Sequence, residues 1–221
     1  MIPLRIDFRF RTPLVVPSWD KPFDGPLARA AVDEATFRGD PDPIANQYNI
    51  GVARHTAGDQ WCFMASNIAI VWAQASEPMT LHRIKRQRIE DYVAATDRGL
   101  LRKMPGFNAG SGPTKAGSYI HSLRWVERAT AYVVASDEDR VRELVAWITH
   151  LGKLAHLDYG AISEAVVNRD DAALEQWSRR PLPFASERAT AHVPTTTALQ
   201  PPYWKRSMEH QRTGMVPVPT A

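Results

Sequence analysis

The sequence predicts an α+β fold of the ferredoxin-like (RRM-like) type, with strands and helices in the order βαββαβ. Three observations favour it. Residues 4–10 alternate apolar and polar side chains, residues 141–151 carry apolar side chains at helical spacing, and a glycine-bounded loop at 152–160 leads into an apolar run. In this fold four antiparallel strands form one sheet, and both helices cover the same face of it.

The first strand and the first helix are expected within the N-terminal forty residues. Strict alternation over residues 4–10 is typical of a half-buried strand. Its predicted core positions are Leu4, Ile6, Phe8 and Phe10. A weaker helix is expected over residues 26–38, because Pro26 suits a first helical turn and Asp24 can cap it. The core face of that helix is predicted to hold Leu27, Ala30, Ala31 and Phe37.

The middle of the chain is predicted to supply the second and third strands. Residues 39–59 are polar and rich in Gly and Pro, which indicates a loop. Residues 61–73 are almost wholly apolar, so they favour one long central strand or a tight pair broken near Ser66. Residues 119–135 form a further strand, in which Glu127 interrupts the apolar alternation and indicates a bulge or an edge.

The clearest helix of the sequence follows this strand. Ser136 and Asp139 have the spacing of a capping box, and Gly152 is expected to end the helix. Its apolar stripe consists of Val141, Leu144, Val145, Ile148 and Leu151. A last core strand is expected at 161–167, and a short helix containing Trp177 at 171–179.

Charge and proline content divide the chain into a domain at 1–185, a thumb insertion within it at about 76–118, and a proline-rich C-terminal extension at 186–221. The net charge is only +3, yet residues 81–103 hold seven Lys and Arg against three Asp and Glu. Localised positive charge favours a polyanionic partner. The alternative is a solvated helix face with pairs such as Arg86 and Glu90.

Several classes of protein are disfavoured. The chain has a single cysteine, Cys62, in an apolar run, which indicates an inert thiol and a reducing, cytoplasmic setting. No apolar stretch is long enough to span a membrane, and no signal peptide is apparent. The seven histidines show no metal-binding spacing, so no metal or other cofactor is expected.

Two further features admit two interpretations each. The loop at 152–160 can present backbone N–H groups and Lys153 to a phosphate chain, or it can simply end a helix at a glycine. Arg124, Arg128 and Tyr132 share one face of a predicted strand. That face is either the exposed side of an edge strand or a sheet surface that stacks bases and holds phosphates.

Taken together, these motifs resemble the RAMP superfamily of CRISPR effector proteins. The resemblance rests on the first strand leading through Thr12-Pro13-Leu14 to Asp24-Gly25-Pro26-Leu27, on the glycine-rich loop after the second helix, and on the basic insertion. The chain length and the stretch from Trp177 to Arg180-Pro181-Leu182-Pro183 are most similar to the type IV subunit of the Cas-five group. The loop departs from the family pattern, since Leu154 and Ala155 are apolar and Ala161 follows Gly160.

The resemblance implies a non-catalytic, RNA-binding subunit that holds the 5′ handle of a guide RNA. It also implies contacts with the repeated backbone subunit and the large subunit of a type IV complex, with target DNA nearby and no membrane. The expected RNA contacts, from the resemblance and the basic segments together, are Arg83, Lys85, Arg86, Arg88, Lys115, Arg124, Arg128, Gly152, Lys153, His156, Tyr159 and Gly160.

Two alternatives stay open at this point. A metal-independent endoribonuclease that processes guide RNA precursors would recruit His121 beside Tyr119, or His156 beside Lys153. A ferredoxin-like module that binds only protein would need neither the loop nor the basic segment for its function.

Overall fold

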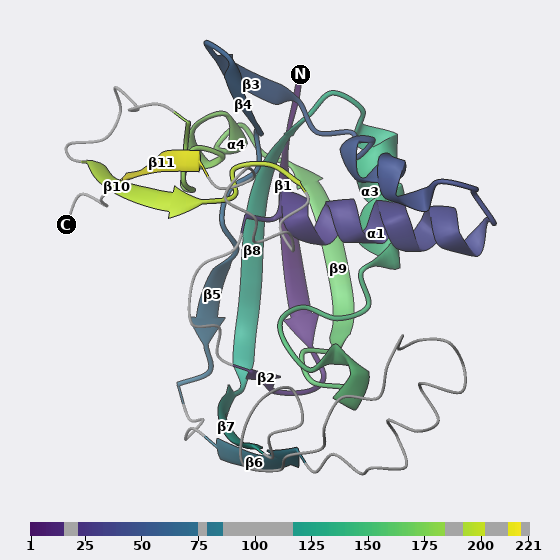
Figure 1. The fold of residues 1–221 in the computed structure, drawn as a ribbon, viewed down its shortest axis with the longest axis vertical. Helices are drawn as coiled ribbons and strands as arrows, with labels where there is room; N and C mark the ends of the chain where they lie inside the picture. Colours follow the sequence, from purple (N-terminus) through teal and green to yellow (C-terminus); the bar gives the residue numbers. More distant parts are fainter. Residues whose placement is uncertain (16–21, 75–78, 86–116, 184–191, 202–211, 218–221) are drawn as a thin grey trace, which may run out of the picture. The chain divides into compact units, whose positions relative to one another are not determined.

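A computed structural model describes residues 1–15, 22–74, 79–85, 117–183, 192–201 and 212–217 (Figure 1). The chain folds as two compact units, one formed by Met1–Ser76 with Arg124–Ala221 and the other by Glu77–Leu123. The predicted fold class is confirmed at the level of a mixed α+β protein with antiparallel sheets and few helices. No helix among the described residues is long and apolar enough to cross a membrane.

The larger unit is built on a four-stranded antiparallel sheet with the spatial order β5-β8-β1-β9. Its strands are β1 (Ile2–Phe10), β5 (Ala69–Trp72), β8 (Val126–Ala135) and β9 (Ile162–Arg169). The alternation predicted for β1 is confirmed, because Leu4, Ile6 and Phe8 are fully buried. Burial of each such side chain contributes roughly 2 kcal/mol.

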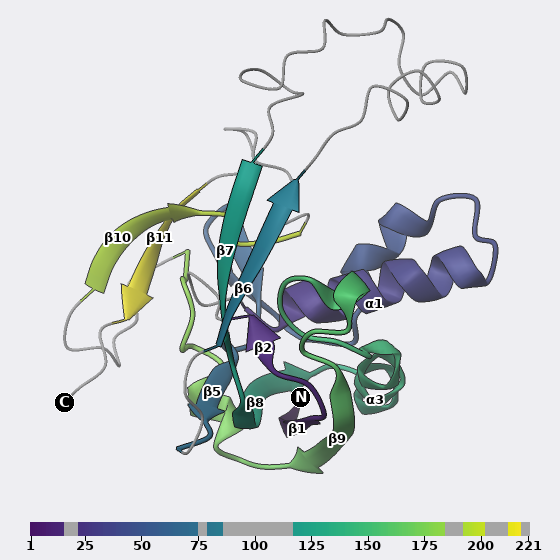
Figure 2. The same ribbon diagram turned by 90° about the horizontal axis from the view of Figure 1, so that it is seen from below.

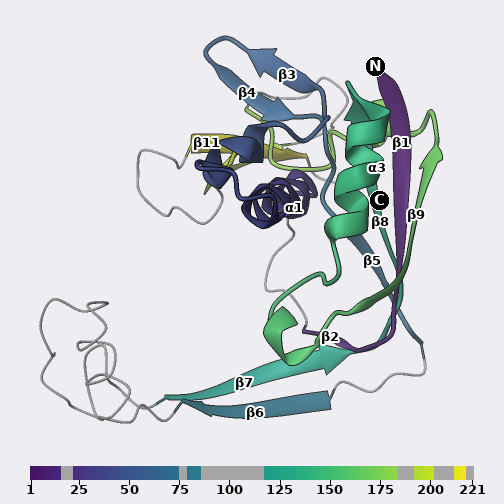
Figure 3. The same ribbon diagram turned by 90° about the vertical axis from the view of Figure 1, so that its right-hand side faces the viewer.

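Two helices cover one face of this sheet, as Figure 3 shows: α1 (Asp24–Phe37) and α3 (Glu138–Trp147). In α1, Leu27, Ala30 and Ala31 are buried as predicted, but Phe37 is 80% exposed. Phe37 is excluded from the core because the last turn of α1 extends beyond the sheet (Figures 1 and 2). The prediction for this residue was therefore wrong.

Asp24 does not cap α1. Phe23 precedes the helix without a side-chain cap, and the buried carboxylate of Asp24 instead forms an ion pair of 3.0 Å with Arg180. The Arg180 guanidinium also donates to the carbonyl oxygens of Phe63, Ala65 and Leu199. A buried charge pair with this many partners is costly to break, since either group left alone would be an uncompensated charge.

The ends of α3 also differ from the prediction. Asp137, not Ser136, caps the helix, since its side chain accepts from the amide of Arg140 at 3.0 Å. The helix ends at Trp147 rather than at Gly152. The chain becomes extended at Ile148 because Leu151 donates to the Gly160 carbonyl at 2.9 Å, while Ile162 donates to the Thr149 carbonyl at 2.9 Å. Every residue of the predicted apolar stripe is nevertheless buried.

The predicted loop at 39–59 contains regular structure. It forms the 3₁₀ helix η1 (Pro43–Tyr48) and the strand β3 (Arg54–Ala57), which pairs with β4 (Gln60–Phe63) as a hairpin. The apolar run at 61–73 is broken near Ser66, as the second alternative predicted. However, β4 and β5 are not paired with each other, because they belong to different sheets.

The predicted strand at 119–135 is two strands, β7 (Gly117–Arg124) and β8, separated at Trp125. The irregularity predicted at Glu127 is confirmed: Val71 lies opposite Arg128 and Trp72 opposite Val126, so Glu127 has no partner in the ladder. The strand predicted at 161–167 is β9, which pairs with β1 and whose Ile162 and Val167 pack against the core. It forms an edge of the sheet, and most of its side chains are exposed.

The C-terminal part contains more structure than the sequence indicates. Helix α4 (Ala173–Gln176) is followed directly by the buried side chain of Trp177. Strands β10 (His192–Thr197) and β11 (Arg212–Pro217) pair as an antiparallel ribbon within the proline-rich extension. Two short elements complete the larger unit, β2 (Leu14–Val15) and the 3₁₀ helix η3 (Ala155–Leu157).

The smaller unit contains strand β6 (Met79–Lys85), which pairs in antiparallel register with β7. In this ladder Arg83 lies opposite Tyr119, and Lys85 lies opposite Gly117.

Candidate nucleic-acid interface

The predicted RNA contacts fall into four groups. Arg83 and Lys85 lie on β6 of the smaller unit. Three others lie outside the described residues: Arg86, Arg88 and Lys115. Arg124 ends β7, Arg128 lies on β8, and the remaining five lie in the loop at 152–160.

Both glycines that bound this loop are required by its backbone. Gly152 has φ +90° and Gly160 has φ +70°, a region that residues with a side chain rarely adopt. Space is also short at Gly160, where an added Cβ would lie 2.0 Å from the carbonyl oxygen of Leu151 and 2.9 Å from Leu14 Cδ1. At Gly152 the nearest atom would be Leu14 Cδ1, at 2.7 Å. The loop therefore packs closely on β2.

The loop is also fixed from within. Leu154 and Asp158 both adopt left-handed backbone conformations, with φ of 62° and 64°. Between them, Leu157 donates to the Leu154 carbonyl at 2.8 Å and Asp158 donates to the Ala155 carbonyl at 2.9 Å. Two non-glycine residues in this region carry a conformational cost of about 1–2 kcal/mol each, which the surrounding structure must offset.

Thr12 anchors the far side of the loop, a role that the sequence did not indicate. Its hydroxyl donates to the Asp158 carbonyl at 2.6 Å and accepts from the Ala161 amide at 2.9 Å. The Gly160 amide donates to the Pro13 carbonyl at 2.9 Å. The segment just after β1 therefore holds the loop in place, although 146 residues of sequence separate Thr12 from Asp158.

A second anchor missed by sequence reasoning is His150. Its Nε2 lies 3.0 Å from Asp158 Oδ1, and Arg11 lies 3.4 Å from the same oxygen. The hydrogen bond from His150, together with the nearby Arg11, lowers the pKa of Asp158 below its usual value. A carboxylate, an imidazole and a guanidinium thus join the base of the loop to the end of β1.

The outer part of the loop has unused hydrogen-bonding capacity. Among the described residues, none accepts a hydrogen bond from the consecutive amides of residues 152–156. The side chains of Lys153 and His156 are exposed and have no hydrogen-bond or ion-pair partner in the described part of the chain. Successive amides in a turn that contains left-handed residues form a concave surface suited to an anion.

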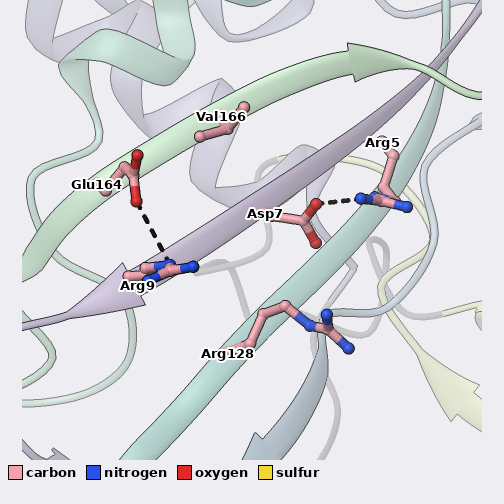
Figure 4. A pocket seen from close by; sticks show the side chains of 6 residues that line it. All are labelled: Arg5, Asp7, Arg9, Arg128, Glu164 and Val166. Carbon is pink, nitrogen blue, oxygen red and sulfur yellow. Dashed lines mark hydrogen bonds and ion pairs between the residues drawn. The ribbon is translucent and has the colours of Figure 1, made fainter.

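A second cluster lies on the sheet face opposite to helices α1 and α3. Arg5, Asp7, Arg9, Arg128, Glu164 and Val166 line a shallow hollow of about 260 Å³ there (Figure 4). Arg5 pairs with Asp7 at 2.8 Å and Arg9 with Glu164 at 3.4 Å, whereas Arg128 forms no ion pair with a described residue. Arg128 is the side chain of this cluster that is left available to an anionic ligand.

Arg124 does not extend this cluster as the sequence suggested. The chain breaks at Trp125, and the Arg124 guanidinium lies over the ring of Trp72, 5.0 Å from its centre. Tyr132 does lie on the same sheet face as this cluster, since it is opposite Arg5 in the ladder between β8 and β1. Of the three side chains predicted to share one face, only Arg128 and Tyr132 do so.

The candidate catalytic groups are found in different places. His121 lies on β7 opposite Leu81 in the smaller unit, and His156 lies in the loop at 152–160. Among the described residues, no group of three or more metal-ligating side chains is present. Cys62 is fully buried, and burial raises the pKa of its thiol to about 11. The expected apolar setting of this thiol is confirmed.

Comparison with known proteins gives one family. The family model of the CRISPR type IV associated protein Csf3 matches residues 2–215. No curated protein matches the chain.

Proposed function

We propose that this chain, which belongs to the Csf3 family of CRISPR type IV associated proteins, is a non-catalytic subunit that binds the 5′ handle of a guide RNA. The observation that carries the proposal is the run of amides at 152–156 without an acceptor among the described residues, beside the exposed side chains of Lys153 and His156. An RNA phosphate supplies the acceptors and the negative charge that this loop lacks.

The proposed fold is the ferredoxin-like arrangement. Its support is the strand order β5-β8-β1-β9 together with helices α1 and α3 on one face of the sheet (Figure 3). In sequence order these strands are the second, third, first and fourth of the sheet, which is how a split βαβ unit places them. The β3–β4 and β10–β11 hairpins are additions to that plan.

The mechanism we propose is electrostatic and structural. The loop at 152–160 fixes the RNA backbone by shape, since its glycines and its Thr12 and His150 anchors hold the amides in one geometry. The basic residues at 83–88 supply most of the charge. Backbone contacts of this kind position an RNA, while any base specificity comes from its unpaired nucleotides.

A binding measurement tests this proposal. The purified chain is titrated into fluorescently labelled handle RNA at two salt concentrations, and compared with a variant in which Arg83, Lys85, Arg86 and Arg88 are all Ala. We expect the variant to bind at least about tenfold more weakly. Its salt dependence should be shallower, by roughly 0.7 in log–log slope for each RNA phosphate that the variant no longer neutralises.

The matched control removes two exposed arginines elsewhere, Arg29 on α1 and Arg179 beyond α4. That double Ala variant should bind as the parent chain does. Unchanged RNA affinity in the quadruple Ala variant would contradict the proposal. The same RNA is then run on a denaturing gel: site-specific cleavage that is lost in His121→Ala or His156→Ala would contradict the non-catalytic part of it.

Contacts with the backbone and large subunits of a type IV complex are also part of the proposal. Their support is membership of a type IV associated family and the resemblance to the Cas-five group. Purification of the assembled complex tests whether this chain is bound to the backbone and large subunits.

A further inference from the structure

The last turns of α1 and α3 display a pair of aromatic side chains on the surface. Phe37 is 80% exposed and Trp147 is 37% exposed, and their ring centres lie 5.6 Å apart. Each ring comes from the C-terminal turn of a different helix. Two adjacent large aromatic side chains left in water are a feature of contact surfaces, where their burial contributes most of the binding energy.

A network of charges adjoins this pair. Arg38, which follows Phe37, pairs with Glu143 at 3.3 Å and with the buried carboxylate of Glu34 at 2.7 Å. Arg140 pairs with Glu143 at 2.6 Å and with Glu34 at 2.7 Å. The hydrogen bond from Arg140 is the main reason that the pKa of Glu143 is lowered. Both arginines are therefore already engaged by carboxylates of the same chain.

The network borders a polar hollow of about 210 Å³. Its lining consists of Glu34, Ala35, Arg38, Asp40, Asn46, Asn49 and Arg140. Asp40 accepts from the Asn46 side chain and from the Asp42 amide, and it has no cation partner among the described residues. The acidic side chains here, Glu34, Asp40, Asp42 and Glu143, outnumber the two arginines.

We infer that this α1–α3 surface, formed by Phe37, Trp147, Asp40 and Glu143, is a docking site for another protein of the type IV assembly. The partner segment carries a Lys or Arg beside apolar side chains. Its cation meets Asp40 in the hollow, and its apolar side chains cover Phe37 and Trp147. The surplus of negative charge disfavours a nucleic acid here, because like charges at an interface weaken binding. The docking site rests on family membership and on none of the proposed RNA contacts.

Photo-crosslinking tests the identity of the occupant. Phe37 is replaced by p-benzoylphenylalanine, which keeps an aromatic ring at the position, in the chain co-expressed with the other type IV proteins and their guide RNA. Irradiation of the purified complex should join this chain to one protein subunit, identified by mass spectrometry. A crosslink to RNA, or no crosslink in an assembled complex, would overturn the inference.

Assembly measurements test its chemistry. The double variant Phe37→Ser/Trp147→Ser should reduce the amount of this chain in the purified complex by about tenfold. Asp40→Asn, which removes the charge and keeps a side chain that can accept hydrogen bonds, should reduce it by about threefold. The matched control is Val71→Ser/Leu174→Ser, at exposed apolar positions elsewhere, and should assemble normally.

Handle-RNA affinity of the isolated variants separates this inference from the proposed function. It should stay within about twofold of the parent chain, because the changed residues share no partner with the proposed RNA contacts. Normal assembly of both the double variant and Asp40→Asn would overturn the docking site. The docking site would also be overturned if either variant lost RNA affinity by the same factor as it lost assembly. Asp40→Asn decides the matter if the double variant does not fold, because Asp40 lies on the surface.

Discussion

Helices α1 and α3 lie on the same face of the sheet, yet the chain leaves them in opposite ways. After α1, Gly39 donates to the Thr36 carbonyl at 3.1 Å and Asp40 donates to the Ala35 carbonyl at 2.9 Å. This is a Schellman closure, in which the turn satisfies its own amides. After α3, the amides of residues 152–156 have no acceptor among the described residues. The segment after α1 carries Asp40 and Asp42, whereas the loop after α3 carries the exposed side chains of Lys153 and His156.

The glycines at the two exits show what each exit needs. Gly39 and Gly160 have similar φ angles, +76° and +70°. An added Cβ at Gly39 would meet nothing within 4 Å, whereas at Gly160 it would lie 2.0 Å from a backbone oxygen. Gly39 is needed only for its conformation, and Gly160 for both conformation and space. After α1 the amides of Gly39 and Asp40 are hydrogen-bonded and the nearby side chains are acidic, which suits a protein partner. In the loop at 152–160 the amides of residues 152–156 have no acceptor among the described residues, which suits a phosphate.

The largest expected effect is on stability. Gly160→Ala should lower the free energy of unfolding by about 3–4 kcal/mol, since Leu151 or the loop must move. Gly39→Ala should cost only about 1 kcal/mol, from the positive φ alone. Urea unfolding followed by circular dichroism measures both. Equal losses in the two variants would contradict the proposed packing of the loop.

The next effect is on RNA affinity. Lys153→Ala/His156→Ala should weaken handle-RNA binding by about tenfold, because charge-assisted contacts contribute roughly 1.5 kcal/mol or more. Asp40→Asn, at the other exit, should leave the affinity unchanged. Fluorescence anisotropy titrations at one fixed salt concentration compare them. Weaker RNA binding by Asp40→Asn would contradict the view that only the loop at 152–160, and not the segment after α1, contacts RNA.

The loop exit should also depend on pH through Asp158. Its folded-state pKa is lowered by His150 and Arg11, so the stabilisation it contributes is present above the unfolded value of 3.8. That stabilisation is lost as pH falls through the folded-state pKa. Parent chain and Asp158→Asn should therefore differ in melting temperature at about pH 6, and the difference should shrink as the pH falls below 3.8 and through the folded-state pKa. A difference that persists in acid would contradict the ion-pair account.

The smallest effect is expected at Cys62, which serves as a reference for global opening. With a pKa of about 11, roughly one thiol in a thousand is ionised at about pH 8. Iodoacetamide should therefore label Cys62 of the native parent chain very slowly. Fast labelling of the parent chain would mean that Cys62 is not in the buried setting described.

The sequence predicted those parts of the fold that depend on the spacing of apolar side chains within one helix or strand. The alternation in β1, the apolar stripe of α3 and the bulge at Glu127 all follow from side-chain periodicity, which the sheet preserves. The outer position of Phe37 could not be predicted, because it depends on where the sheet ends. Nor could the cap at Asp137, since Ser136 and Asp137 are both good capping residues and the tertiary path selects one.

The same distinction applies to the candidate interface. Gly152, Lys153 and Gly160 could be recognised because a glycine-bounded basic loop is a local feature. Thr12 and His150 could not, because their importance comes from contacts with Asp158 that only the folded chain creates. The pairing of Asp24 with Arg180 is likewise non-local, and the helix-capping pattern around Asp24 pointed elsewhere.

Amide hydrogen exchange in the presence of handle RNA tests the central claim most directly, because it reports on the same amides that have no acceptor in the described part of the chain. Peptides that cover residues 152–156 should exchange several times more slowly when the RNA is bound. Peptides that cover residues 38–46 should exchange at the same rate with and without RNA. Unchanged exchange at 152–156 under saturating RNA, or protection at 38–46 instead, would contradict the account.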